Sequence, residues 1–128
     1  MKLLLDTHTF IWLDSNPSRL SERVRSLLQD PNNTLFLSVV SIWEIQIKTQ
    51  IGKLQLSIPL AELVKSQRQA NMIEILPVSL SHVLALDHLP LHHKDPFDRL
   101  LIAQANLEDA TLVSQDEILS SYSVQLIW

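Results

Sequence analysis

The sequence predicts an α/β domain in which helices cover both faces of a parallel sheet. Short apolar runs of the kind that form strands alternate along the chain with longer amphipathic segments of helical period. The short runs are apolar nearly throughout, so both faces of each strand are expected to be buried. Because crossovers between parallel strands are right-handed, this order of elements favours a doubly wound fold. Gly52 is the single glycine, which disfavours an all-β fold with many tight turns.

Strands are expected where short runs rich in apolar and β-branched residues are bounded by turn-forming residues. The segment DPNN (30–33) is one such turn and leads into the second run. The runs predict a sheet of four to five strands. In chain order they are KLLL (2–5), TLFL (34–37), IEIL (73–76), TLVS (111–114) and VQLIW (124–128).

Helices are expected in the amphipathic segments between these runs. Pro59 suits the start of the fourth segment, and Pro77 and Pro90 bracket the fifth. In chain order the expected helices are residues 7–14, 20–29, 41–51, 60–70, 80–87 and 97–107.

Composition indicates a single domain over residues 1–128, in which 46% of residues are apolar and 19% charged. The absence of cysteine excludes disulfides and thiolate metal sites and fits a reducing cytosol. The opening apolar run is too short for a signal peptide, and no run approaches the ~20 residues of a membrane span, so a soluble, cytoplasmic protein is expected. The net charge of -4 argues against broad electrostatic wrapping of nucleic acid but does not exclude a local basic rim.

Four acidic residues stand out because they lie at the ends of predicted elements. Asp6 follows the first strand and Asp116 follows the fourth, while Glu44 and Asp98 lie in the first turns of helices. Taken singly, each could be no more than a helix cap, since acids at helix starts meet free N–H groups and the positive end of the helix dipole.

Local motifs support this capping interpretation. SIWE (41–44) and SQDE (114–117) both match the capping box. Asp95 followed by proline has the pattern of an N-cap with proline at the first helical position. Glu44 could also pair with Lys48 one turn later.

Taken together, the four acids predict a cation site. Ligands of open parallel sheets bind beyond the carboxyl ends of the strands, where the strand order reverses. In a 3-2-1-4-5 order the first and fourth strands are neighbours, which would bring Asp6 and Asp116 together, and helices at the same edge could add Glu44 and Asp98. Two carboxylates ~4 Å apart repel by ~4 kcal/mol at an effective dielectric near 20, and capping energies of ~0.3–1 kcal/mol do not offset several such pairs. Oxygen ligands without thiolates suit Mg²⁺ or Mn²⁺, and an ion so held suits phosphodiester hydrolysis.

The segment LPLHHKDPFDRLLIAQA (89–105) contains one of these acids beside two histidines. Asp95 is expected to cap the following helix, and Asp98, one turn in, is the better candidate ligand. His92 and His93 are adjacent and lack the spacing of paired histidines in zinc motifs, so they are expected to flank the pocket, either as loop structure or in contact with a substrate.

Four segments of the chain resemble those of PIN-domain proteins and, more narrowly, of the VapC-type toxins of prokaryotic toxin–antitoxin pairs. The segments occur in the same order as in that family, and the resemblance extends from Met1 to Trp128. They are LLLDTHTFIW, SIWEIQIKTQIGKL, LPLHHKDPFDRLLIAQA and TLVSQDEILSSYSVQLIW.

The resemblance implies a Mg²⁺-dependent endoribonuclease with a Rossmann-like α/β/α fold, often a homodimer, that is inhibited by a cognate antitoxin. The family's four acids fall on Asp6, Glu44, Asp98 and Asp116. Asp6, Asp98 and Asp116 would hold Mg²⁺ directly or through water, and Glu44 would orient the attacking water or a second ion.

Candidate substrate contacts surround these acids. The hydroxyl residues that accompany the family's first and fourth acids fall on Thr7 and Ser114. The basic residues that could meet RNA phosphates are Lys48, Lys53, Lys94 and Arg99.

Two other functions are compatible with parts of the sequence. LLLDTHT approaches the D-x-D-x-T signature of haloacid-dehalogenase-like phosphatases with Asp6 as nucleophile, although His8 replaces the second aspartate, which supplies the acid/base role. A non-catalytic interaction module with the PIN fold could instead use Trp12, Trp43 or Trp128 on a partner surface. Aromatic residues at helical spacing are more often core, and we expect at least two of the three to be buried.

Overall fold

The computed structural model describes residues 1–128 and contains a sheet of five parallel strands in the order β3-β2-β1-β4-β5. The central strand β1 (Lys2–Leu5) pairs with β2 (Thr34–Ser38) on one side and with β4 (Thr111–Val113) on the other. The outer strands are β3 (Glu74–Leu76) and β5 (Leu126–Ile127). The predicted α/β class and the predicted pairing of the first and fourth strands are confirmed.

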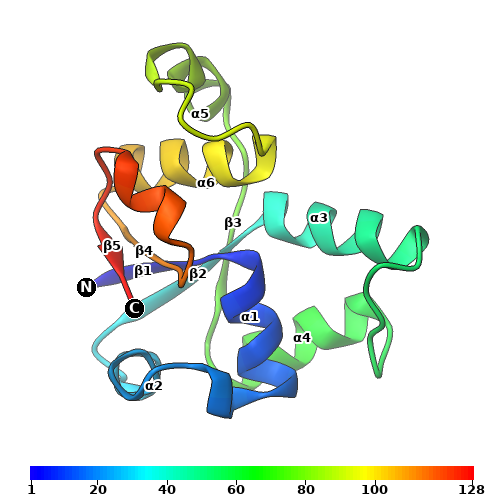
Figure 1. The fold of residues 1–128 in the computed structure, drawn as a ribbon. Coiled ribbons are helices and arrows are strands. Elements are labelled where there is room, and N and C mark those ends of the chain that lie inside the picture. The colour runs from blue at the N-terminus through cyan, green and yellow to red at the C-terminus, as the bar shows by residue number, and fades with distance from the viewer.

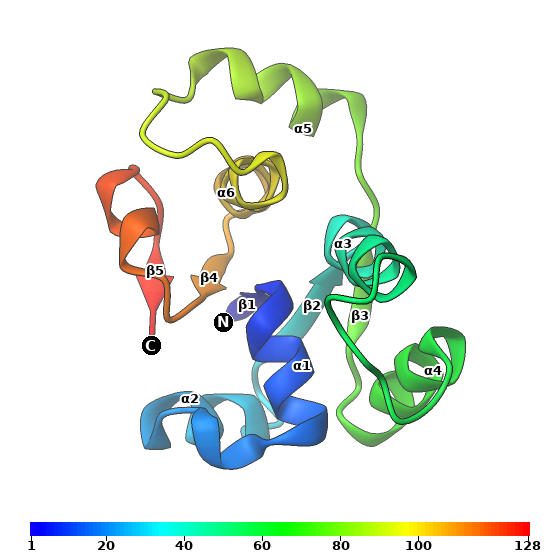
Figure 2. The same cartoon turned by 45° about the vertical axis from the view of Figure 1, so that its right-hand side comes forward.

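Helices cover both faces of the sheet: α6 lies on one face, whereas α1, α2 and α4 lie on the other (Figures 1 and 2). The six α-helices are α1 (Thr7–Ser15), α2 (Glu22–Gln29), α3 (Val39–Gln50), α4 (Leu60–Ala70), α5 (Leu80–Ala85) and α6 (Pro96–Leu107). Three short 3-10 helices complete the chain: η1 (Pro17–Arg19), η2 (Leu86–His88) and η3 (Glu117–Ser121). None of the helices combines the length and apolar composition that a membrane span requires.

The apolar run of β1 supplies the core on both faces. Leu3 and Leu5 pack into the cluster that contains Phe10 of α1, whereas Leu4 faces the other way and packs with Leu101 of α6. All of these side chains are fully buried. Successive strand side chains point to opposite faces, so a strand covered on both sides must be apolar at every position.

Two of the three tryptophans pack against the core. Trp12 and Trp128 are partly buried, with 5.9 Å between their ring centroids. Trp43 is 56% exposed, and its ring meets the edge of Phe97. The expectation of burial therefore holds, in part, for Trp12 and Trp128.

The start of α3 differs from its prediction. The helix begins at Val39, directly after β2, and its N-cap is Ser38, whose hydroxyl accepts a hydrogen bond from the Val40 N–H at 3.0 Å. The capping box predicted at SIWE is therefore wrong. Ser41 lies inside the helix, and its buried hydroxyl has no hydrogen-bond partner.

Other predicted boundaries shift by a few residues. The predicted helix 80–87 divides into α5 and η2, and the last strand is shorter than the predicted segment 124–128. The capping box predicted at SQDE is also wrong, because Asp116 itself caps η3. A capping box that the sequence reasoning missed joins Ser79 and His82 at the start of α5.

Four helix starts lie at one edge of the sheet. α1, α3 and η3 each follow the carboxyl end of a strand, and α6 runs back toward the amino end of β4, so its own start lies at the same edge (Figure 1). The fold thus collects helix N-termini, with their free N–H groups, where ligands of such sheets bind.

The two serines of α3 provide a test of where the helix begins. Ser38→Ala should lower the free energy of unfolding by about 1 kcal/mol because an N-cap is lost. Ser41→Ala should leave it unchanged or raise it, because a buried hydroxyl without a partner is removed. Urea unfolding of the two variants and the parent protein measures both. The reverse order of stabilities would contradict the assigned cap.

Candidate active site

Asp6 joins the end of β1 to the start of α1. Its Oδ1 accepts a hydrogen bond from the Thr9 N–H at 2.8 Å, and its backbone N–H donates to the carbonyl of Val113 in β4 at 3.1 Å. The side chain is 6% exposed. Burial raises the pKa of the Asp6 carboxyl above its ordinary value, although hydrogen bonds from Ser114 and Thr9 partly oppose this effect. Asp6 therefore caps α1 and at the same time carries a carboxylate that water solvates poorly.

Glu44 enters the same region from α3. The sequence predicts Glu44 in the first turn of its helix. Because α3 begins at Val39, Glu44 instead lies in the second turn. Its Oε1 accepts from the Thr7 hydroxyl at 2.7 Å, and its Oε2 accepts from the Lys48 ammonium at 2.6 Å. The carboxylate is buried yet neutralised within its own helix, so its orientation is fixed.

Asp98 lies in the first turn of α6, where Asp95 is the N-cap. Oδ1 of Asp95 accepts from the N–H groups of Phe97 at 2.9 Å and Asp98 at 3.3 Å, which is the capping role predicted for it. Asp98 Oδ2 lies 2.9 Å from His93 Nε2. Burial, reinforced by the charges of Asp95 and Glu44, raises the pKa of Asp98 to about 6, against the lowering effect of the His93 hydrogen bond.

Asp116 follows β4 and is partly buried. Its Oδ1 accepts from the Ile118 N–H at 3.0 Å and thereby caps η3. Its own N–H donates to the Ser114 hydroxyl at 3.1 Å. Ser114 is 2% exposed, so it shapes the loop that carries Asp116 and does not line the cavity described next.

All four acids line a single cavity of about 180 Å³. No hydrophobic residue lines it, and the remaining lining residues are Thr7, His8, Lys48, His93 and Asp95. One ligand atom from each of His93, Asp98 and Asp116 lies within 4.8 Å of the other two. Asp6 lines the same cavity but is not part of this closer group. Carboxylate oxygens with one imidazole nitrogen form a donor set that a divalent cation such as Mg²⁺ or Mn²⁺ can use.

His93 is the residue at this cavity that sequence reasoning did not identify as a ligand candidate. Its ring reaches Asp98 across the turn that Asp95 caps, five residues along the chain. The sequence does place His92 and His93 shortly before DPFD (95–98). Two adjacent histidines, however, do not indicate which of the two rings faces the cavity.

Three predicted phosphate contacts lie outside the cavity. The Arg99 guanidinium donates to the carbonyls of Pro90, Leu86 and Leu89 and to the Tyr122 hydroxyl, so it holds the segment before α6 and is not free to meet a phosphate at the acids. Lys53 and Lys94 are exposed and do not line the cavity.

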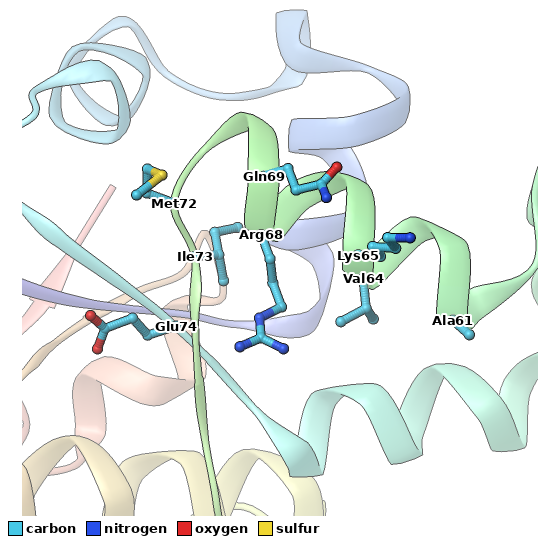
Figure 3. Close-up of a pocket in the computed structure, with 8 residues that line it drawn as sticks. All are labelled: Ala61, Val64, Lys65, Arg68, Gln69, Met72, Ile73 and Glu74. Atoms are coloured by element: carbon cyan, nitrogen blue, oxygen red, sulfur yellow. The ribbon is translucent and has the colours of Figure 1, made fainter.

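Other cavities differ in character from the acidic one. A more open hollow of about 520 Å³ lies between α4 and β3 and contains a single acid, Glu74, opposite Lys65 and Arg68 (Figure 3). By contrast, a hollow of about 450 Å³ shares Asp6, His8 and Asp116 with the acidic cavity and adds Trp12, Gln115 and Glu117. The acidic cavity therefore adjoins this second hollow and shares three lining residues with it.

The pKa of Asp98 predicts how stability depends on pH when no divalent cation is present. The pKa rises from an ordinary value of 3.8 to about 6 on folding, so between these values the folded protein binds more protons than the unfolded chain. This contribution to stability is fully present below pH 3.8 and is lost as the pH rises through about 6.

Asp98→Asn should therefore be more stable than the parent protein at pH 7 in EDTA, with a Tm higher by roughly 3–6 °C, and the difference should vanish near pH 4. The amide oxygen still accepts from His93, so only the charge is removed. Thermal unfolding followed by circular dichroism measures this, with the exposed Asp87→Asn as the control. Equal stabilities of parent and Asp98→Asn at pH 7 would contradict the prediction.

Comparison with known proteins agrees with this geometry. The family model of the PIN domain matches residues 3–124. A chain of the VapBC2 structure from Rickettsia felis, bound to a DNA fragment from its promoter, superposes with a TM-score of 0.74 at 18% identity, covering 99% of this chain and 98% of that one. A chain of the DNA-bound VapBC structure from Salmonella typhimurium has a TM-score of 0.69 at 13% identity, covering 99% and 97% of the two chains.

A relative in sequence is Ribonuclease VapC22 of Mycobacterium tuberculosis (strain ATCC 25618 / H37Rv). It is 27% identical over 121 residues, which cover 94% of this chain and 91% of that protein. The solved structures establish the likeness of the fold, and the family model spans nearly the whole chain. The protein belongs to the PIN-domain family.

Proposed function

We propose that this protein is a divalent-metal-dependent endoribonuclease and the toxin of a toxin–antitoxin pair. The observation that carries the proposal is the convergence of Asp6, Glu44, Asp98 and Asp116 on one wholly polar cavity. Membership of the PIN-domain family and the similarity to a protein named Ribonuclease VapC22 support it. The phosphatase alternative is set aside, because the family is a different one and His8 stands where that chemistry needs a second aspartate.

The charge balance of the cavity supports a cation. Lys48 neutralises Glu44, but no lysine or arginine pairs with Asp6, Asp98 or Asp116. Burial raises the pKa of both Asp6 and Asp98, which means that each ionised form lacks compensation in the protein alone. Asp6, Asp98 and Asp116 would hold the ion, directly or through water.

The chain's own residues divide the remaining work. When bound, Mg²⁺ would supply positive charge to the phosphodiester and make nearby water more acidic. Glu44, oriented by Thr7 and Lys48, presents a carboxylate that can orient the attacking water and accept its proton. Because water and not the 2′-hydroxyl of RNA is the nucleophile, the products carry a 5′-phosphate and a 3′-hydroxyl.

The surroundings of the cavity are suited to binding an RNA strand. The adjoining hollow of about 450 Å³, which shares Asp6, His8 and Asp116 with the cavity, would give a strand room to continue past the acids. The rings of Trp12 and His8 lie there with 5.6 Å between their centroids and an interplanar angle of 36°, and they offer aromatic surface to a base. Lys94, exposed and next to His93, remains the candidate phosphate contact from the segment before α6.

The proposed partner is a cognate antitoxin. The solved structures similar to this chain include VapBC complexes, and the same fold in this protein supports an equivalent partner. We also propose a homodimer in the cytoplasm.

The first test is cleavage of single-stranded RNA. The protein should cleave with Mg²⁺, should stop on addition of EDTA, and should leave products whose 5′ ends can be ligated without prior phosphorylation. Asp6→Asn and Asp98→Asn should each lower the rate by about 10²–10³-fold because several kcal/mol of charge stabilisation is lost. Asp87→Asn should cleave as the parent does. Activity that persists in EDTA and in both variants would end the proposal.

The second test concerns the toxin role. Induced expression of the protein should arrest growth of a bacterial host, and Asp6→Asn should not. We expect a small reading frame beside its gene; co-expression with the product of that frame should restore growth, and the two proteins should co-purify. Arrest that is equally strong with Asp6→Asn would separate toxicity from RNA cleavage and contradict this role.

A further inference from the structure

The ring of His93 is directed at the acidic cavity from the segment between η2 and α6. Its Nε2 lies 2.9 Å from Asp98 Oδ2, and both side chains are 21% exposed. A ring nitrogen of His93 and one oxygen each of Asp98 and Asp116 all lie within 4.8 Å of one another. Ligands held at about 2.1 Å from one ion are themselves about 3–4 Å apart, so the spacing of these three atoms is close to that of a shared ion.

The position of His93 is built into the core and is not that of a free surface histidine. Its backbone N–H donates to the Tyr122 hydroxyl at 2.9 Å, and Tyr122 is 5% exposed. Arg99 donates to the same hydroxyl at 3.2 Å and to the carbonyl of Pro90 at 2.8 Å. These bonds tie the segment on both sides of His93 to α6 and to the buried tyrosine, which holds the ring in place for a ligand.

The protonation of the ring is compatible with ligation. Without an ion, Nε2–H of His93 donates to Asp98; no protein group hydrogen-bonds to Nδ1, so with an ion bound Nδ1 can carry the proton while Nε2 presents its lone pair to the cavity. The other acids leave room for a direct nitrogen ligand: Glu44 is neutralised by Lys48, and Asp6, which lies outside the close group, would reach the ion through water.

We propose that His93 is a nitrogen ligand of the divalent cation, together with Asp98 and Asp116, and that it makes this site prefer Mn²⁺ over Mg²⁺. The inference rests on the proposed function for the existence of a cation site. Oxygen ligands and water suit Mg²⁺, whereas an imidazole ligand strengthens binding of transition-metal ions much more than binding of Mg²⁺.

The neighbouring histidine is a matched control. His92 is exposed, does not line the cavity, and makes an edge contact with the Tyr122 ring at 5.2 Å between centroids. His8 lines the cavity from α1 but is not in the close group, so it serves as the control for an imidazole that is near without ligating.

The test is pulsed EPR of Mn²⁺ bound to the intact protein, which detects a directly coordinated nitrogen, together with calorimetric Kd values for Mn²⁺ and Mg²⁺. The parent protein, His8→Ala and His92→Ala should show nitrogen coupling that changes on ¹⁵N-histidine labelling. His93→Ala should lose it, and its Kd for Mn²⁺ should rise about tenfold while that for Mg²⁺ changes less than about twofold. His93→Gln repeats the comparison should His93→Ala prove unstable.

The proposal is overturned by a parent protein without nitrogen coupling, by coupling that survives in the His93 variants, or by an unchanged ratio of the two Kd values. These outcomes are distinct from failure of the proposed function. Nitrogen coupling without RNA cleavage would contradict the proposed ribonuclease function and support His93 as a metal ligand. Metal-dependent cleavage that Asp6→Asn abolishes, without nitrogen coupling, would support the ribonuclease function and contradict His93 as a metal ligand.

Discussion

Repulsion among carboxylates that share one small cavity is the constraint around which the site is organised. Asp6, Asp98 and Asp116 have no lysine or arginine partner, and their mutual repulsion would push them apart if the backbone allowed it. The backbone does not allow it, because Asp6 caps α1, Asp116 caps η3, and Asp95 fixes the turn that carries Asp98. Main-chain N–H groups that the helix starts leave free thus hold Asp6 and Asp116 directly, and they hold Asp98 through its neighbour Asp95.

Capping and cation binding are therefore complementary roles of the same residues. A cap uses one carboxylate oxygen, such as Oδ1 of Asp6 and of Asp116, and leaves the other available. The doubly wound fold brings such caps together because every strand delivers the next helix start to the same edge. In the absence of an ion the arrangement costs stability, as the raised pKa values of Asp6 and Asp98 indicate, and this strain is what a divalent cation would relieve.

A second set of polar contacts holds the acids and the segments that carry them in position. Thr7 and Lys48 engage both oxygens of Glu44, and Ser114 accepts from the Asp116 N–H. Arg99, predicted as a phosphate contact, instead holds the segment that positions His93. In each case a residue chosen from the sequence for its chemistry near the substrate serves to position the residues that line the cavity.

The sequence by itself determined the fold class, the approximate positions of the five strands and which four acids lie near the ends of elements. The period of apolar residues and the ends of elements are local properties that neighbouring residues encode. Local signals also misled: SIWE matches a capping box, yet the strand before it runs directly into the helix and Ser38 takes that role. Only the tertiary structure decided which of two adjacent histidines faces the acids and where the Arg99 guanidinium is used. Those choices depend on Tyr122, more than twenty residues away in the chain, whose buried hydroxyl fixes the backbone of His93 through contacts that no local pattern specifies.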